Sequence, residues 1–157
     1  MKTAVAMAVA VALAGTAPAG LALAQTSGTY GTVNLSAGFM PDPHRAGVVS
    51  GGTINSRDYL DGCVGWIADE PDYVVNYQAG SVLPLIFYVE AEGDTTLVIA
   101  DPDDEFFCDD DSGGNLNPRV HITRPVSGEY AIWVGSYREG AYHQSTLFVT
   151  ELSSQGR

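Results

Sequence analysis

Short runs that alternate apolar and polar positions follow one another along the chain from Tyr73 to Thr150. Alternation with a period of two is typical of half-buried β-strands, and the runs are separated by Gly, Pro and Asp, which are turn residues. No segment after residue 24 shows the spacing of an amphipathic helix. The predicted strands lie in PDYVVNYQAG, LPLIFYVEAEGD, TTLVIADPDD, RVHITRPVSG, GEYAIWVGSY and HQSTLFVTEL.

Seven to nine short strands joined by tight turns predict an all-β fold. The strands are expected to pair antiparallel, because a parallel crossover needs a dozen or more residues. We therefore expect an antiparallel two-sheet β-sandwich of jelly-roll type. Within it, Val120 and Ile122 should point inward and His121 outward, and Tyr130 should lie on the face opposite Trp133.

The first 24 residues have the composition of an export signal. Met1-Lys2 is a short basic start, Thr3 to Ala14 is an apolar run, and Ala22-Leu23-Ala24 has the small side chains that precede a cleavage site, so we expect cleavage before Gln25. The alternative is an uncleaved membrane anchor, but glycine and proline interrupt the run well before the ~20 apolar residues that a span requires. The predicted location is secreted or periplasmic, without stable membrane insertion after cleavage.

The remainder of the chain is predicted to consist of a lead-in, one domain and a short tail. Residues 25–47 are rich in Gly, Ser, Thr and Pro and predict an irregular lead-in or linker, with a strand at Thr32 to Leu35. Residues 48–152 are predicted to form one β-sandwich domain, and residues 153–157 a tail. This length suffices for one ordinary domain with a hydrophobic core.

The net charge indicates which partners to expect, and the cysteines predict a disulfide. Loss of Lys2 with the signal leaves six basic residues against 19 acidic ones, a balance that repels nucleic acid and attracts cations. Export places Cys63 and Cys108 in an oxidising compartment, where an even number of cysteines predicts a disulfide. A metal pair is the alternative, but neither His nor a further Cys is close in sequence. A disulfide closing a loop of about 45 residues stabilises by about 4 kcal/mol in the chain-entropy view.

The run Asp111-Ser112-Gly113-Gly114 resembles the nucleophile segment of trypsin-like serine peptidases, whose glycines help to form the oxyanion hole. Three observations oppose this interpretation. Asp110 stands where that motif has its first glycine, the chain is short for a two-barrel peptidase, and no histidine has the sequence context of the catalytic base. We expect Ser112 not to be a nucleophile, and we expect the histidines to be plain surface residues: His44, His121 and His143.

Seven of the eleven positions from Asp101 to Asp111 are carboxylates. Carboxylates at this density repel one another, and a hard cation with oxygen ligands relieves the repulsion. Two interpretations stay open, a calcium site and a solvated turn, because Asp, Ser, Gly and Asn are also the ordinary residues of tight loops. The spacing differs from that of an EF-hand loop. The candidate calcium ligands are Asp101, Asp103, Asp109, Asp110, Asp111 and Asn115, with Asn117 and the carbonyls of residues 112–114 in support.

Aromatic side chains offer a second kind of candidate site. Trp66 and Tyr137 are the candidate binding residues, because aromatic rings on a sandwich face can stack on sugars; Trp133, Tyr88 and Tyr142 could extend such a platform. The alternative is packing, since large aromatics also fill sandwich cores, and Trp133 is assigned to the core. Phe106 and Cys108 share the predicted inward face of a very short strand between the two acidic stretches.

A series of short motifs runs in order through the second half of the chain: Asp72-Tyr73, Ala79-Gly80, Thr95-Thr96-Leu97, Asp101-Pro102-Asp103, Asp109-Asp110-Asp111, Pro118, Ser127-Gly128-Glu129-Tyr130 and Ile132 to Tyr137. This series resembles the bacterial pre-peptidase C-terminal (PPC) domain and its close secreted relatives, over about half of the mature chain. The resemblance implies a jelly-roll sandwich, usually appended to an exported enzyme and in some cases binding calcium or polymeric substrates. No catalytic domain is expected in this chain, and the cysteine pair is not general in that family.

Together these features predict a secreted, non-catalytic β-sandwich module. Its expected partner is an extracellular polymer or protein, with no nucleic acid, and calcium is its candidate cofactor. The alternatives are a structural envelope protein and, from the Ser112 run, a serine peptidase.

Overall fold

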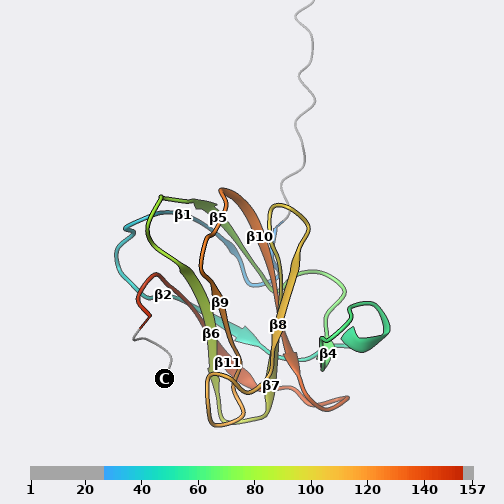
Figure 1. The fold of residues 1–157 in the computed structure, drawn as a ribbon. Coiled ribbons are helices and arrows are strands. Elements are labelled where there is room, and N and C mark those ends of the chain that lie inside the picture. Colours follow the sequence, from blue (N-terminus) through green and yellow to red (C-terminus); the bar gives the residue numbers. More distant parts are fainter. Residues whose placement is uncertain (1–26, 154–157) are drawn as a thin grey trace, which may run out of the picture.

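The computed structural model describes residues 27–153 and shows two β-sheets packed face to face (Figure 1). The predicted signal peptide and residues 154–157 of the predicted tail lie outside the described residues. The larger sheet contains β1 (Thr32–Ser36), β3 (Ile54–Asn55), β4 (Trp66–Ile67), β5 (Tyr73–Gln78), β7 (Thr95–Ala100), β8 (Phe106–Asp109) and β10 (Gly128–Ser136). The smaller sheet contains β2 (His44–Val49), β6 (Leu85–Ala91), β9 (Arg119–Ile122) and β11 (Gln144–Thr150). One short 3-10 helix, η1 (Ser56–Asp58), lies between β3 and β4.

The strand order confirms the predicted jelly roll. The smaller sheet has the order β2-β11-β6-β9, and the larger sheet contains β5-β10-β7-β8. From β5 to β11 the chain changes sheet at every connection except the β7–β8 turn, as the strands of a jelly roll do. The strands β3 and β4 are added beside the end of β10.

One strand pair departs from the predicted antiparallel arrangement. β1 pairs in parallel with β5, with Thr32 opposite Val74 and Ser36 opposite Gln78. A parallel neighbour is possible here because some 35 residues, including all of β2, β3 and β4, separate the two strands. Pairing with β5 extends the larger sheet beyond the eight strands of the jelly roll.

The segment predicted as an irregular lead-in contributes to both sheets. It contains β1, close to the predicted strand, and also most of β2, which pairs along β11. A buried polar cluster fixes the loop between them: Glu151 accepts hydrogen bonds from Tyr77 Oη at 2.6 Å and from Gly38 N at 2.8 Å. Burial and the neighbouring Glu151 raise the pKa of Tyr77, so this hydroxyl stays a donor to the carboxylate.

The main core lies between the sheets and is built from the alternation that the sequence predicts. Tyr130, Ile132 and Val134 of β10 are fully buried in it, and Val120 and Ile122 of β9 join them while His121 is exposed. From the opposite sheet come Leu85, Phe87, Val89, Leu147 and Val149. The alternating pattern therefore predicted the inward face of β9, and it correctly placed Tyr130 on the face of β10 opposite Trp133.

A second, smaller hydrophobic cluster lies on the outer face of the larger sheet. It shows that the predictions for the inward face of β8 and for Trp133 were wrong. Phe106 is 48% exposed, whereas Phe107 packs on the main core, so the inward face of β8 is opposite to the predicted one. Trp133 and Cys108 pack in the second cluster instead of the main core. The prediction failed because it assumed that a sandwich strand has one buried face. Here an insertion also covers the outer face.

Candidate functional site

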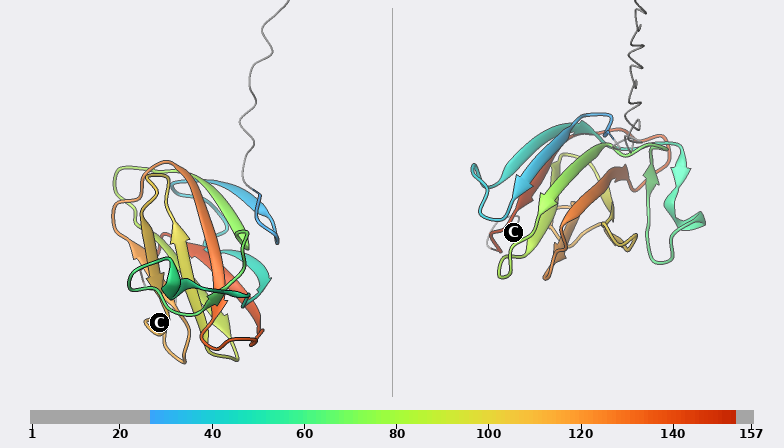
Figure 2. Two further views of the ribbon diagram at one scale, coloured as in Figure 1. Left: turned by 90° about the vertical axis from the view of Figure 1, so that its right-hand side faces the viewer. Right: turned by 90° about the horizontal axis from the view of Figure 1, so that it is seen from above.

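The insertion between β2 and β5 covers part of the outer face of the larger sheet. It contains β3, η1 and β4, and it projects beside β4 from the rest of the sandwich (Figure 1, Figure 2). Cys63 in the insertion forms a disulfide with Cys108 of β8, with their Cα atoms 5.3 Å apart. This confirms the predicted disulfide and fastens the insertion to the sheet that it covers.

Local hydrogen bonds give the insertion its shape. Asn55 Oδ1 accepts from Arg57 N at the start of η1, as an N-cap residue does. Buried Ser56 donates through both its backbone N and its Oγ to the carbonyl of Gly65, at 2.9 Å and 3.0 Å. These bonds close a loop over residues 56–65, in which the side chains of Tyr59 and Leu60 line a pocket.

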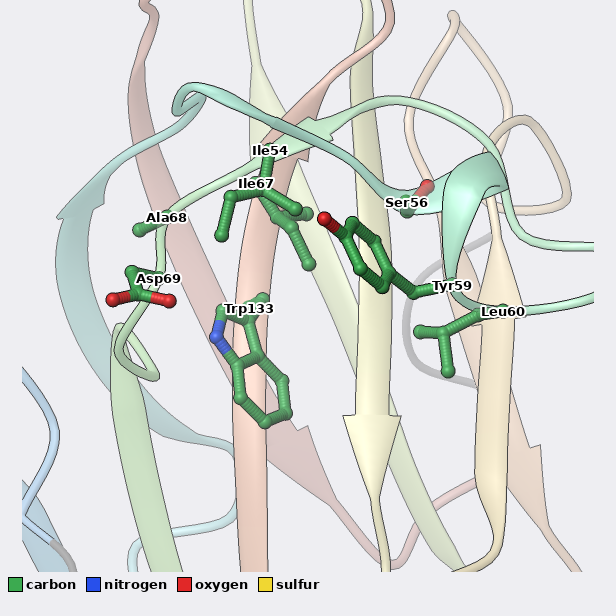
Figure 3. Close-up of a pocket in the computed structure, with 8 residues that line it drawn as sticks. All are labelled: Ile54, Ser56, Tyr59, Leu60, Ile67, Ala68, Asp69 and Trp133. Carbon is green, nitrogen blue, oxygen red and sulfur yellow. The ribbon is translucent and has the colours of Figure 1, made fainter.

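That pocket has a volume of about 320 Å³ and lies between the insertion and the outer face of β10 (Figure 3). Its walls are mostly apolar, with one carboxylate and two hydroxyl-bearing side chains among them. The lining residues are Ile54, Ser56, Tyr59, Leu60, Ile67, Ala68, Asp69 and Trp133. A concave apolar site with a few polar groups has the usual composition of a ligand pocket.

Trp133 supplies the aromatic surface of the pocket. Its indole Nε1 is buried and has no hydrogen-bond partner among the described residues. In Figure 3 this nitrogen lies on the side of the ring where Asp69 and Ala68 line the pocket. Tyr59, by contrast, is 78% exposed, so this wall of the pocket is accessible from solvent.

The two predicted binding residues lie outside this pocket. Trp66 pairs with Ser136 through the backbone and is half-buried, and Tyr137 is 42% exposed with Arg57 stacked 5.8 Å from its ring centre. Neither lines the pocket, and their role in binding stays a prediction. The sequence signal for the pocket was the apolar pair Tyr59-Leu60 in an otherwise polar stretch before Cys63.

Two of the six candidate calcium ligands cap turns with their carboxylates. Asp101 Oδ1 accepts from the backbone N of Asp103 and of Glu105, both at 2.9 Å. Asp109 accepts from Ser112 N at 2.9 Å, from Arg119 N at 2.8 Å and from the Ser112 hydroxyl. These are the hydrogen bonds by which Asp stabilises tight loops.

The two acidic side chains that follow Asp109 lie at the surface: Asp110 is half-buried and Asp111 is exposed. Partial desolvation and the nearby carboxylates of Asp110, Asp94 and Asp109 raise the pKa of Asp111. Asn115 has a left-handed backbone, and its carbonyl accepts from Asn117 Nδ2 at 3.3 Å. Residues 27–153 contain no group of three or more His, Cys, Asp or Glu arranged to hold a metal ion. Calcium binding stays a prediction.

The polar groups of the run Asp111-Ser112-Gly113-Gly114 form hydrogen bonds within its own turn. The Ser112 hydroxyl donates to Asp109, and the amides of Gly113 and Gly114 donate to the carbonyls of Asn117 and Asp111, both at 2.9 Å. An oxyanion hole needs free N–H groups directed at the substrate. Here the glycine amides are used within the loop.

His44 differs from its predicted place on the surface. It lies on β2, half-buried, and its Nε2 is 3.0 Å from Tyr73 Oη in the opposite sheet. Burial lowers the pKa of His44 and raises that of Tyr73. Their hydrogen bond links the two sheets, and it involves neither Ser112 nor the pocket.

Comparison with known proteins gives no family. No family model matches the chain, and no curated protein matches it. A solved structure, the periplasmic inhibitor of g-type lysozyme PliG from Aeromonas hydrophila, matches over 76% of this chain and 96% of its own, with 14% sequence identity and a TM-score of 0.38. A score this low does not assign the chain to the fold of that inhibitor. In the described residues no helix is long and apolar enough to cross a membrane.

Proposed function

We propose that this protein is an exported, non-catalytic jelly-roll module that binds an extracellular polymer or protein in the Trp133 pocket. The observation that carries the proposal is the indole of Trp133, which lines an apolar, accessible pocket and whose buried Nε1 has no partner among the described residues. A buried donor without an acceptor costs about 1–3 kcal/mol. A ligand that brings an acceptor to this nitrogen recovers that energy, in addition to the apolar surface that it covers.

The loop that forms the pocket is held in place before any partner arrives. The disulfide to Cys108 and the two hydrogen bonds of Ser56 restrain the segment that carries Tyr59 and Leu60. A restrained site loses less conformational entropy on binding, so more of the contact energy appears as affinity. This favours a dedicated binding surface over an incidental gap between strands.

Export is supported by the disulfide together with the signal pattern of residues 1–24. Structural disulfides persist in secreted and periplasmic proteins and are rare in a reducing cytosol. We therefore place the mature protein in the periplasm or outside the cell.

The PPC resemblance gains support from what its motif residues do in this fold. Asp72 Oδ2 accepts from Val134 N at 2.8 Å, and the Tyr130 hydroxyl donates to the carbonyl of Val126 at 2.8 Å while accepting from its N–H. With the turns capped by Asp101 and Asp109, the motif residues complete sheets and loops. We propose that the chain is a relative of that family, in which these residues maintain the fold.

The binding proposal is tested with arrays of extracellular proteins and glycans, probed with the labelled mature protein and with its Trp133→Ala variant. We expect at least one ligand whose binding is lost in Trp133→Ala. The Trp66→Ala and Tyr137→Ala variants test the two residues predicted from sequence on the same arrays. Retention of every ligand by Trp133→Ala would contradict the proposal.

The absence of serine hydrolase chemistry has its own test. We expect a fluorophosphonate probe to leave the protein unlabelled, because the Ser112 hydroxyl donates to Asp109 and is not paired with a base. The Ser112→Ala variant is the matched control. Labelling of one serine per chain that disappears in Ser112→Ala would show a nucleophile and overturn the non-catalytic assignment.

A further inference from the structure

Four carboxylates lie in or next to the segments that line the Trp133 pocket. Asp69 lines the pocket itself. Asp58 and Asp61 flank the lining pair Tyr59-Leu60, and Glu70 follows Asp69; all four side chains are exposed. The pocket thus combines apolar walls with one carboxylate of its own and three more in the segments that form it; these four carboxylates are called the acidic rim.

One basic residue does not balance the four carboxylates of this segment. Between Ile54 and Glu70 the sequence contains one basic residue, Arg57, against four acidic ones. The guanidinium carbon of Arg57 lies 5.8 Å from the ring centre of Tyr137, and Tyr137 is not part of the pocket. The segment therefore has three more acidic than basic residues, in a protein whose net charge is already −12.

An arginine side chain has the chemistry that this combination requires. Its aliphatic stem can pack on apolar walls, and its planar guanidinium stacks on the face of an indole and pairs with carboxylates. A volume of about 320 Å³ is large enough for one such side chain.

We propose that the partner is a cationic protein that inserts an arginine side chain into the Trp133 pocket, against Trp133 and Asp69, with further basic residues facing the acidic rim. This inference rests on the proposed function and names its partner class. Electrostatic complementarity of this kind steers association and selects against anionic partners. Other occupants, such as a neutral polysaccharide, are outcomes of the test.

The test measures binding of a fluorescent (Arg-Gly)₅ peptide to the mature protein. The matched probe is (citrulline-Gly)₅, which keeps the shape of the side chain and removes its charge, and cellohexaose represents a neutral polysaccharide. The variants are Trp133→Ala and Asp69→Asn. Glu90→Gln is the control, since Glu90 is exposed on β6 in the opposite sheet and its substitution removes the same charge.

We expect (Arg-Gly)₅ to bind and the citrulline peptide to bind at least about tenfold more weakly, with affinity falling between about 50 mM and about 500 mM NaCl as screening increases. Trp133→Ala and Asp69→Asn should each weaken the arginine peptide about tenfold or more, and Glu90→Gln less than about twofold. Equal losses in Asp69→Asn and Glu90→Gln would show attraction to overall charge and overturn the inference.

Failure of the inference is distinguishable from failure of the proposed function. Salt-independent binding of cellohexaose that Trp133→Ala abolishes would overturn the arginine partner and leave the Trp133 pocket as a binding site. If no peptide, sugar or array ligand depends on Trp133, both proposals fail. Circular dichroism of each variant identifies any loss of binding that comes from unfolding.

Discussion

Asp72 shows how one buried carboxyl completes the larger sheet. β5 pairs with β10 as far as Tyr73 opposite Ile132, and β4 pairs with β10 only at Ser136. In the gap, Asp72 Oδ2 accepts from Val134 N at 2.8 Å, so the side chain supplies an acceptor that a strand would otherwise provide. Asp72 is 2% exposed, and burial raises its pKa to about 7, although the Val134 hydrogen bond opposes the shift.

This raised pKa predicts how stability depends on pH. Between about pH 4 and pH 7 the unfolded chain carries an ionised Asp72 while the folded protein keeps it protonated, so the folded state binds more protons. The free energy of unfolding should fall as pH rises through this window, by up to about 4 kcal/mol from this group. Asp72→Asn should remove the contribution and be the more stable protein at pH 8. Chemical denaturation of both proteins at pH 5 and pH 8 measures this difference in stability. If the free energies of unfolding of the two proteins changed in parallel with pH, the prediction would be wrong.

Asp109 and Asp110 are adjacent carboxylates with different roles. Asp109 accepts hydrogen bonds from the backbone of Ser112 and of Arg119 and from the Ser112 hydroxyl. We expect Asp109→Ala to lower the free energy of unfolding by about 1–3 kcal/mol, because it leaves those donors without an acceptor. Asp110→Ala removes the same charge but no side-chain hydrogen bond seen in residues 27–153, and should stay within about 0.5 kcal/mol of the parent. Urea denaturation compares them, and equal effects would mean that charge outweighs turn capping.

At the residue scale the sequence predicted burial better than it predicted roles. The alternation identified Val120 and Ile122 as buried and His121 as exposed, because period-two burial is a local property of a strand. The density of carboxylates between Asp101 and Asp111 suggested that Asp109 was a candidate calcium ligand. Whether an Asp caps a turn or binds a cation depends on which amides lie near it, and Arg119, one of its donors, is ten residues away. The roles therefore required the three-dimensional structure.

The disulfide fastens one element to another. Cys63 lies in the insertion and Cys108 in β8, so the bond restrains the loop that forms the outer wall of the Trp133 pocket. We expect the folded mature protein to have no titratable thiol. A Cys63→Ala/Cys108→Ala variant should lose about 4 kcal/mol of stability, as the chain-entropy view gives for a loop of about 45 residues, and should bind Trp133-dependent ligands more weakly.

The matched measurement is denaturation of both proteins with and without dithiothreitol. Reduction should destabilise the parent to the level of the variant and leave the variant unchanged. A parent that is indifferent to reduction would show that the rest of the insertion holds its position without the disulfide.

Gly65 permits the insertion to pack closely on the sheet. Its φ is +103°, and a Cβ added there would lie 2.3 Å from Thr96 Oγ1 on β7. Gly65→Ala should therefore destabilise through overpacking, by about 1–3 kcal/mol, in addition to backbone strain. Gly62 in the same loop has φ +81° and no heavy atom within 4 Å of an added Cβ, so Gly62→Ala measures the strain alone. A thermal midpoint for Gly65→Ala equal to that of Gly62→Ala would contradict the close packing.

At the element scale the sequence predicted the strands of the jelly roll and missed what is added to them. β5, β6, β7, β9, β10 and β11 all lie within predicted runs. β3 and β4 have two residues each, too few to show a period. The parallel partner of β1 lies far along the chain, and no local pattern encodes such a pairing. The reversed face of β8 also depends on a distant part of the chain, because Cys108, which the pattern assigned to the core between the sheets, is covered by the insertion on the outer face instead.

For the whole molecule, the fold class followed from the number and spacing of strands, but the candidate site did not. The Trp133 pocket joins residues 54–60 and 67–69 to a tryptophan more than sixty positions later. The predicted disulfide indicated from the sequence that the insertion contacts the region of Cys108, but it did not indicate the contact with Trp133. The net charge follows directly from the sequence, whereas the position of Asp69 in an apolar pocket depends on the folded insertion.

Net charge also bears on the calcium prediction, because any salt screens repulsion in a protein with a charge of −12. Specific binding must therefore be separated from screening. If the loop of Asp109, Asp110 and Asp111 binds calcium, the thermal midpoint should be higher in millimolar CaCl₂ than in NaCl of equal ionic strength, and a chelator should abolish the difference. A site with a Kd a hundredfold below the calcium concentration adds about 2.7 kcal/mol.

The same experiment on two variants locates the effect. Asp111→Asn should shrink the calcium-specific increase, because the carboxylate of Asp111 is one whose pKa its acidic neighbours raise, and a bound cation relieves that repulsion. Glu90→Gln on the opposite sheet should leave the increase intact. Magnesium should substitute poorly, since it requires a tighter octahedral shell than an exposed loop provides. Equal midpoints in CaCl₂ and NaCl would instead favour the solvated turn, in which Asp109 caps the loop and its neighbours contribute only to solubility.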